Sequence, residues 1–155
     1  MSEPNPPAVK RPLVVGYDGR DESERALDEA FREARQREVD VIVLVVAGLP
    51  YEVVDPYELG SIDFTPMTPI PAEGPLEIQP ILAEARRRLE EAGVAGTVDW
   101  SLGDPATELL RVAREQDAGA IVVGTHHHSA LGRLFGTDIA ADLVRDAPCE
   151  VLVAR

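Results

Sequence analysis

Three adjacent histidines lie in a short segment between two glycine positions. His126–His128 follow Gly124, and Gly136 and Thr137 come after them. Backbone N–H groups favour anions where a strand ends and a helix begins, so a loop of this composition suits an anionic ligand. A protonated histidine in this loop would place a positive charge beside such an anion, which predicts tighter binding at lower pH.

The same histidines raise two other possibilities, a metal site and a hydrolase. Imidazole is a common metal ligand, but adjacent histidines in one loop rarely converge on one ion, and no second group of Cys, His or Asp ligands is evident in the sequence. His128 and Ser129 lack the nucleophile-elbow context of hydrolases, and the chain has no Walker-type lysine. We therefore expect no metal site and no catalytic residue.

The composition restricts the classes of partner. The formal net charge is −13, from 28 acidic and 15 basic residues, which argues against binding to nucleic acid or to anionic membranes. No apolar run approaches the ~20 residues that cross a bilayer, and the N-terminus lacks the apolar region of a signal peptide. We therefore expect a cytoplasmic protein. Cys149 is the only cysteine and enters an apolar strand, so it is interpreted as a small buried hydrophobe.

Alternating apolar runs and amphipathic segments must position the histidine loop. Strands are predicted at residues 12–17, 39–46, 97–102, 118–124 and 150–154. Helices are predicted from Asp21 onward, over roughly 77–92, from Pro105 onward and over 137–146. Strands that alternate with helices, and a second strand that is almost continuously apolar, indicate an α/β fold. We expect a single-domain, doubly wound, open parallel five-stranded sheet in strand order 3-2-1-4-5, with helices on both faces.

Local signals mark several helix ends. Asp21 and Glu24 have the spacing of a capping pair at the start of the first helix. Asp104 is a cap residue placed before Pro105, which suits the first position of the third helix. Gly93 is placed to end the second helix.

Two segments fall outside this pattern. Residues 1–11 are polar and proline-rich and are predicted to be a disordered tail, which leaves residues 12–155 as the folded domain. Residues 47–75 are rich in proline and glycine and show no helical or strand period. They are predicted to form a long loop, which is either a functional cover or a loosely ordered surface insertion.

The chain resembles the universal stress protein family over nearly all of residues 12–155. The likeness rests on the first strand with its aspartate turn, the entry to the third helix, the fourth strand and the closing segments. These are residues 13–19, 103–106, 120–125, 129–137 and 147–153. No single segment is specific, but all of them occur in order over a domain of the expected length.

The resemblance implies a nucleotide site. Members that bind nucleotides hold ATP with a loop of the form G-x2-G-x9-G-[S/T]. On that pattern Gly124 is the first glycine, and Gly136 with Thr137 meets the phosphates. Asp18 hydrogen-bonds near the adenosine, and Val46 lines the base pocket. The candidate nucleotide-binding residues are Gly16, Tyr17, Asp18, Val46, Val123, Gly124, His126, His127, Gly136, Thr137 and Asp138.

The loop departs from the family pattern. His127 stands at the second glycine position, and the spacing from Gly124 to Gly136 is one residue short. Asp138 follows the closing pair, where it would cap its helix and compete with a phosphate for backbone N–H groups. Arg20 stands where a small hydroxyl residue is usual after the aspartate turn, and its charge could aid an anion.

Two hypotheses of function follow. The first is a cytoplasmic stress or regulatory protein that binds an adenine nucleotide, ATP with Mg, at the ends of strands one and four. The second is an interaction module of the same fold that binds no nucleotide, in which residues 47–75 or the edge of the C-terminal strand recruit partners. The resemblance implies a homodimer through Glu150–Ala154 in both. We expect no enzyme activity beyond slow, incidental ATP hydrolysis.

Overall fold

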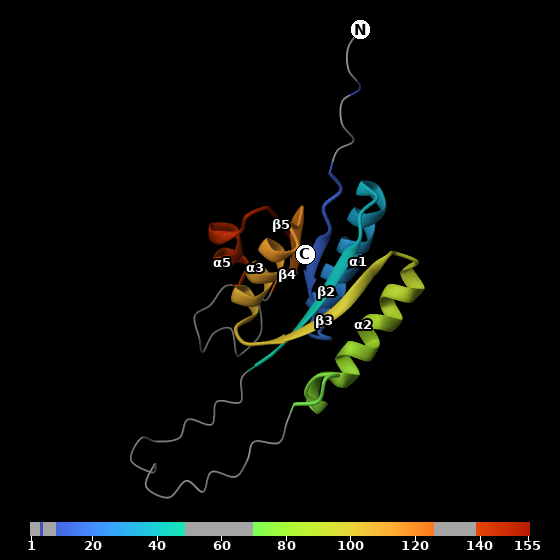
Figure 1. Ribbon diagram of the computed structural model, residues 1–155, viewed down its shortest axis with the longest axis vertical. Helices are drawn as coiled ribbons and strands as arrows, with labels where there is room; N and C mark the ends of the chain where they lie inside the picture. Colours follow the sequence, from blue (N-terminus) through green and yellow to red (C-terminus); the bar gives the residue numbers. More distant parts are fainter. Residues whose placement is uncertain (1–3, 5–8, 49–69, 126–138) are drawn as a thin grey trace, which may run out of the picture.

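Five parallel strands form one sheet in the order β3-β2-β1-β4-β5 (Figure 1). The computed structural model describes residue 4 and residues 9–48, 70–125 and 139–155. The strands are β1 (Leu13–Gly16), β2 (Val41–Ala47), β3 (Gly96–Leu102), β4 (Ala120–Gly124) and β5 (Glu150–Ala154). The predicted parallel sheet and its strand order are therefore confirmed. The boundaries differ from the predicted ones by up to two residues, and β2 includes Ala47, the first residue of the predicted long loop.

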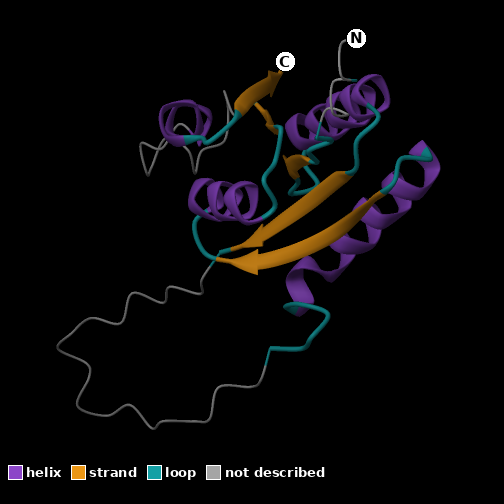
Figure 2. Ribbon diagram, turned by 45° about the horizontal axis from the view of Figure 1, so that its top comes forward, coloured by secondary structure: helices purple, strands orange, loops and turns teal. Residues whose placement is uncertain are grey.

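Helices cover both faces of the sheet (Figure 2). The helices are α1 (Asp21–Arg37), α2 (Gln79–Ala92), α3 (Pro105–Glu115) and α5 (Ile139–Asp146), and a short 3-10 turn, η2 (Leu76–Ile78), precedes α2. The apolar residues of α1 and α2 share one core cluster with one face of the sheet, and those of α3 and α5 share a second cluster with the other face. The doubly wound arrangement follows from this division.

The central strands are buried on both sides. Along β1, Leu13 and Val15 belong to the α1 and α2 cluster, whereas Val14 belongs to the α3 and α5 cluster. This alternation is the two-residue period of a strand, and it explains why the run contains no polar position. The edge strands β3 and β5 are more exposed, and β3 carries polar residues at alternate positions.

The strands end at different heights along the carboxyl edge of the sheet. The pairing of β1 with β2 stops at Gly16 opposite Leu44, and the Tyr17 N–H donates to the Leu44 carbonyl at 3.0 Å. β2 continues beside β3 as far as Ala47, and β4 runs past the end of β1 to Gly124. Because β1 lies between β2 and β4, the sheet is notched there. Chain connections leave this point in opposite directions, which is where ligands bind in open α/β sheets.

The helix ends follow the sequence signals in two cases out of three. The Asp104 carboxylate accepts the Thr107 N–H at 2.9 Å and caps α3, and Gly93 ends α2 with φ 64°. The capping pair predicted at Asp21 is wrong. Arg20 is the cap residue and makes no side-chain cap bond, and Asp21 already lies inside the helix. The Asp18 carboxylate turns the chain earlier, since it accepts the Arg20 N–H at 3.0 Å.

Candidate functional site

A cavity opens at the notch in the carboxyl edge of the sheet. It has about 510 Å³ of empty volume, part of which is open to solvent at its mouth. Of this, about 80 Å³ can hold the centre of a water molecule, so the cavity is small and opens outward. The residues that line it are Gly16, Tyr17, Asp18, Ser23, Leu44, Val46, Pro105, Leu109, Val123, Gly124 and Ile139. They come from β1 and its turn, α1, β2, α3, β4 and α5, so the doubly wound topology brings them together.

Six of the eleven candidate residues line this cavity. These are Gly16, Tyr17, Asp18, Val46, Val123 and Gly124. The other five lie outside the described residues: His126, His127, Gly136, Thr137 and Asp138. The motif residues that the structure describes therefore meet at one place, although the strands that carry them are far apart in the sequence.

The inner wall of the cavity is apolar. Leu44 and Leu109 are 1% and 2% exposed. Gly16 lets α3 approach the sheet, because a methyl group at Gly16 would lie 3.2 Å from the nearest Leu109 methyl carbon. Pro105 fixes the first turn of α3 at the same wall. The apolar period of α3 predicts that Leu109 is buried, but only the crossover of α3 shows that it faces the end of β1.

The polar end of the cavity is a closed set of hydrogen bonds in the turn after β1. The Ser23 hydroxyl donates to the Arg20 carbonyl at 2.9 Å and accepts the Asp18 N–H at 3.2 Å. One oxygen of the Asp18 carboxylate accepts the Arg20 N–H, and the other faces the Arg20 Nε at 3.8 Å. Ser23 is only 4% exposed, so it holds the turn rigidly against α1. No signal in the sequence identified Ser23 as a site residue.

Tyr17 lines the cavity, but its phenol is used elsewhere. The Tyr17 hydroxyl donates to the Glu24 carboxylate at 2.5 Å, and Arg88 of α2 binds the same carboxylate. Burial, followed by the hydrogen bond to Glu24, raises the pKa of the Tyr17 phenol far above its usual value. The Tyr17 hydroxyl thus links the end of β1 to α1 and α2 and is not available to a ligand in the cavity.

Gly124 closes the cavity at the end of β4. A methyl group at Gly124 would lie 2.3 Å from the Glu22 carbonyl oxygen and 2.6 Å from the Glu22 carbonyl carbon. Both contacts are with backbone atoms, so no side-chain rotation can relieve them. The first turn of α1 is therefore packed directly on the end of β4, and only glycine permits that approach.

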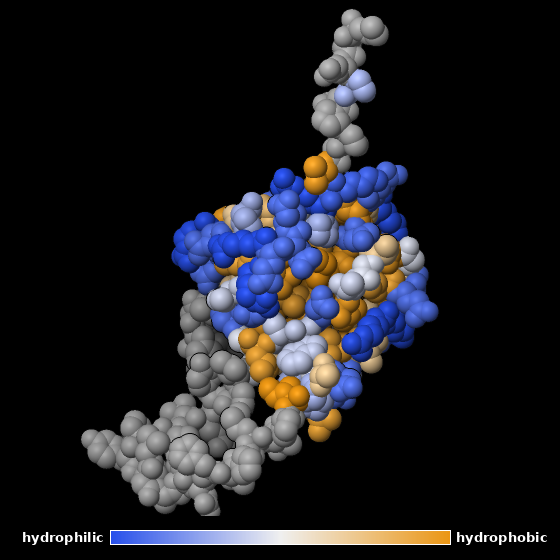
Figure 3. Space-filling view, viewed as in Figure 1, coloured by the Kyte–Doolittle hydropathy of each residue, from blue (hydrophilic) through white to orange (hydrophobic). Residues whose placement is uncertain are grey.

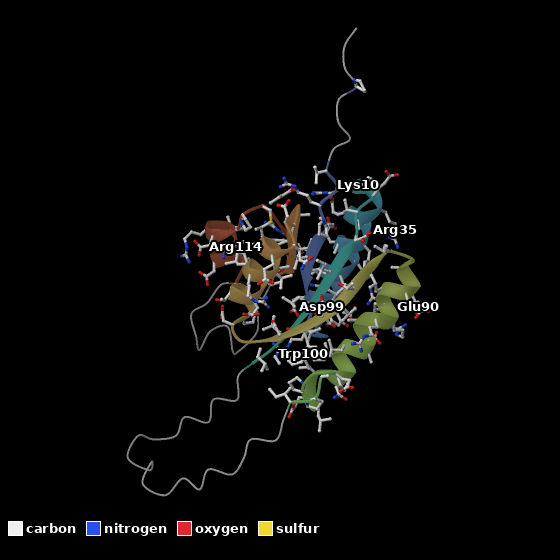
Figure 4. The ribbon with its side chains drawn as sticks, viewed as in Figure 1. Lys10, Arg35, Glu90, Asp99, Trp100 and Arg114 are labelled. Atoms are coloured by element: carbon white, nitrogen blue, oxygen red, sulfur yellow. The ribbon has the colours of Figure 1, made fainter. Side chains whose placement is uncertain are left out.

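The chain that leads into η2 is fixed to the edge strand β3. Trp100 lies on β3 (Figure 4). Its indole N–H donates to the Ala72 carbonyl at 3.3 Å, and Gly74 lies against the indole ring. The Gln79 side chain donates to the Gly74 carbonyl at 3.1 Å. Apolar surface reaches the lower edge of the molecule in Figure 3, and Ile70 and Leu76 are both exposed. The end of the long predicted loop is thus held on β3, and residues 49–69 lie outside the described part of the chain.

The described residues contain neither a metal-binding cluster nor a helix that could span a membrane. No group of three or more His, Cys, Asp or Glu residues in residues 9–48, 70–125 and 139–155 could hold a metal ion, and the three histidines lie outside these ranges. Among the helices within the same ranges, none is long and apolar enough to cross a membrane.

The model of the universal stress protein family matches residues 10–155. The chain belongs to the universal stress protein family. The resemblance seen in the sequence is thereby confirmed.

Relatives within the universal stress protein family match nearly the whole chain. Universal stress protein YxiE of Bacillus subtilis is 30% identical over 146 residues, which cover 92% of this chain and 97% of YxiE. A universal stress protein solved in complex with cAMP is 27% identical, with a TM-score of 0.66 over 94% of this chain and 96% of that chain. The universal stress protein of Archaeoglobus fulgidus in complex with dAMP is 25% identical, with a TM-score of 0.61 over 94% and 98% of the two chains.

Proposed function

We propose that this protein binds an adenine nucleotide in the cavity at the ends of β1 and β4 and acts as a cytoplasmic stress or regulatory protein. The observation that carries the proposal is the cavity itself, which combines an apolar slot with one carboxylate at the notch of a doubly wound sheet. We propose binding without catalysis. Among the described lining residues, the titratable side chains are Asp18 and Tyr17, and the Tyr17 hydroxyl is already hydrogen-bonded to Glu24.

The apolar slot suits a flat heterocycle. Leu44, Leu109 and Val123 form walls without polar atoms in their side chains. The backbone N–H and C=O groups of successive strand residues point to opposite sides of the strand. Those of Val46 therefore point to the same side as those of Leu44, toward β1, but β1 has already ended at this height. We infer that these two groups are available as one donor and one acceptor for the edge of a base.

Relatives support an adenine ligand. The two related universal stress proteins with cAMP and dAMP are both at least 25% identical to this chain over most of its length. ATP with Mg is the finer proposal, and it depends on the glycine pattern of residues 124–137. The departures at His127 and Asp138 bear on the phosphates, whereas the base and sugar would meet Val46 and Asp18.

The test is equilibrium binding by calorimetry, with AMP, cAMP and ATP, the last with and without Mg. A ligand at 100 times its Kd should add about 2.7 kcal/mol to the free energy of unfolding, which raises the Tm of a chain of this size by roughly 5–11 °C. Val46→Phe should fill the slot and weaken binding at least tenfold, whereas Val144→Phe, on the exposed face of α5, should leave it unchanged. An unchanged Tm with millimolar nucleotide would refute the proposal.

A second candidate function follows from the free edge of the sheet. β5 is an edge strand, and Val153 is 36% exposed on it. An edge with apolar side chains pairs readily with another strand, so we propose that β5 forms a homodimer, with or without a nucleotide. The double variant Val151→Lys/Val153→Lys should be monomeric by light scattering. A wild-type protein that is already monomeric at micromolar concentration would contradict the dimer.

A further inference from the structure

Among the described residues, one ion pair contributes charge beside the cavity. Asp18 is the charged side chain among the described lining residues, and Arg20 faces its free oxygen at 3.8 Å. The Arg20 side chain is 51% exposed, so it is held neither by burial nor by a second carboxylate among the described contacts. A single exposed pair of this length contributes little to stability, and the guanidinium is free to exchange partners.

The surroundings of this pair are acidic. Asp21, Glu22 and Glu24 occupy the first turn of α1, next to Arg20, and the whole chain carries a formal charge of −13. An anionic ligand at the cavity therefore meets a repulsive field, to which Asp18 contributes from the shortest range. A preference for an anion must therefore come from local backbone N–H groups and cations.

A second guanidinium lies beside α1, but it is already paired with two carboxylates. Arg88 binds Glu24 and Asp28 on the α1 and α2 side of the sheet, and its side chain is 22% exposed. Arg20, in contrast, lies in the turn that ends at the cavity, and its side chain has one long contact within the described part of the chain, with Asp18. Its planar fork of donors can bind a phosphate through two hydrogen bonds.

We propose that Arg20 determines the preference of the site for phosphorylated over unphosphorylated nucleosides. The inference rests on the proposed nucleotide site. When the ligand is a nucleotide, Arg20 transfers from Asp18 to the phosphate, and the Asp18 oxygen that it leaves accepts a hydrogen bond from the sugar. When the ligand is a nucleoside, Arg20 stays on Asp18 and competes with the sugar for the same oxygen.

The experiment compares the dissociation constants of AMP and adenosine, which differ only by the phosphate. In Arg20→Gln the ratio of the AMP constant to the adenosine constant should rise about tenfold, as expected for the loss of a charge-assisted contact at an exposed site. Arg20→Lys should keep part of the preference. Arg25→Gln is the matched control, because it removes the same charge from an exposed position on α1 and should leave the ratio unchanged.

The outcomes separate the two proposals. If wild-type protein binds neither ligand, the nucleotide site is refuted, and the role of Arg20 with it. If wild-type protein binds AMP and Arg20→Gln keeps the wild-type ratio within twofold, only the role of Arg20 is overturned. The same applies if Arg25→Gln raises the ratio as much as Arg20→Gln, since the effect would then come from net charge. A Tm within a few degrees of wild type shows that the variants are folded.

Discussion

Removing the Leu109 side chain should make room for a methyl group at Gly16. Leu109 is 2% exposed and lies over the end of β1, and a Cβ added at Gly16 would be 3.2 Å from one of its methyl carbons. That distance is tighter than an ordinary contact, so Gly16→Ala alone must displace Leu109. In a Leu109→Ala background the obstacle is absent. The two substitutions should therefore be strongly coupled.

The magnitudes follow from the contact. Leu109→Ala removes three buried carbons, worth ~0.8 kcal/mol each, so the transfer cost is about 2.4 kcal/mol. The additional cost of a void should be small, because the vacated space joins a cavity that already opens to solvent. Gly16→Ala should cost about 1 kcal/mol through overpacking. The double variant should be less destabilised than the sum of the two by about 1 kcal/mol or more.

Urea denaturation, followed by the fluorescence of the single tryptophan and by circular dichroism, measures the four free energies of unfolding. Both probes should give one transition with a constant m-value. A coupling energy below about 0.3 kcal/mol would mean that the two sites are independent. In that case the inference that α3 packs closely on β1 at the cavity wall would be wrong.

Three further predictions concern the frame of the site. Asp104→Ala should remove the cap of α3, cost about 1 kcal/mol and lower the Tm by about 2–4 °C in calorimetry. Tyr17 has a raised pKa in the folded state, so its contribution to stability is fully present below the unfolded pKa of about 10 and is lost as pH rises above it, at up to ~1.4 kcal/mol per pH unit. Tyr17→Phe should flatten that decline in alkaline unfolding titrations, and an unchanged slope would contradict the assignment. Arg88→Ala should cost about 1–2 kcal/mol, because it leaves Glu24 without its partner on α2, whereas Arg87→Ala, which breaks only surface pairs, should stay within about 0.5 kcal/mol in urea titrations.

The sheet could be predicted because its strands are buried on both sides. An apolar run such as residues 41–47 leaves little choice but a central parallel strand, and the alternation with helices then determines the layers. The cavity walls were harder to predict. The period of α3 shows that Leu109 is buried, but its position over Gly16 depends on the crossover, which no local pattern contains.

The polar contacts could be predicted least. Arg86, Arg87 and Arg88 are adjacent and flanked by glutamates, so the sequence gives no reason to separate them. Only the packing of α2 beside α1 directs Arg88 to Glu24 and leaves Arg87 at the surface. The start of α1 was equally hard to predict. Both Asp18 and Asp21 could accept a backbone N–H at this turn, and in the structure Asp18 accepts one, whereas Asp21 lies inside the helix.

Gly124 changes how related sequences should be interpreted. It is the first glycine of a nucleotide-binding pattern, yet the structure requires glycine there because the Glu22 carbonyl occupies the space that any side chain would need. A protein of this fold that had lost every ligand would still keep that glycine if its first helix packed in the same way. Its presence therefore has no diagnostic value for nucleotide binding, and a survey of relatives that scores the motif should give weight only to the positions that follow it.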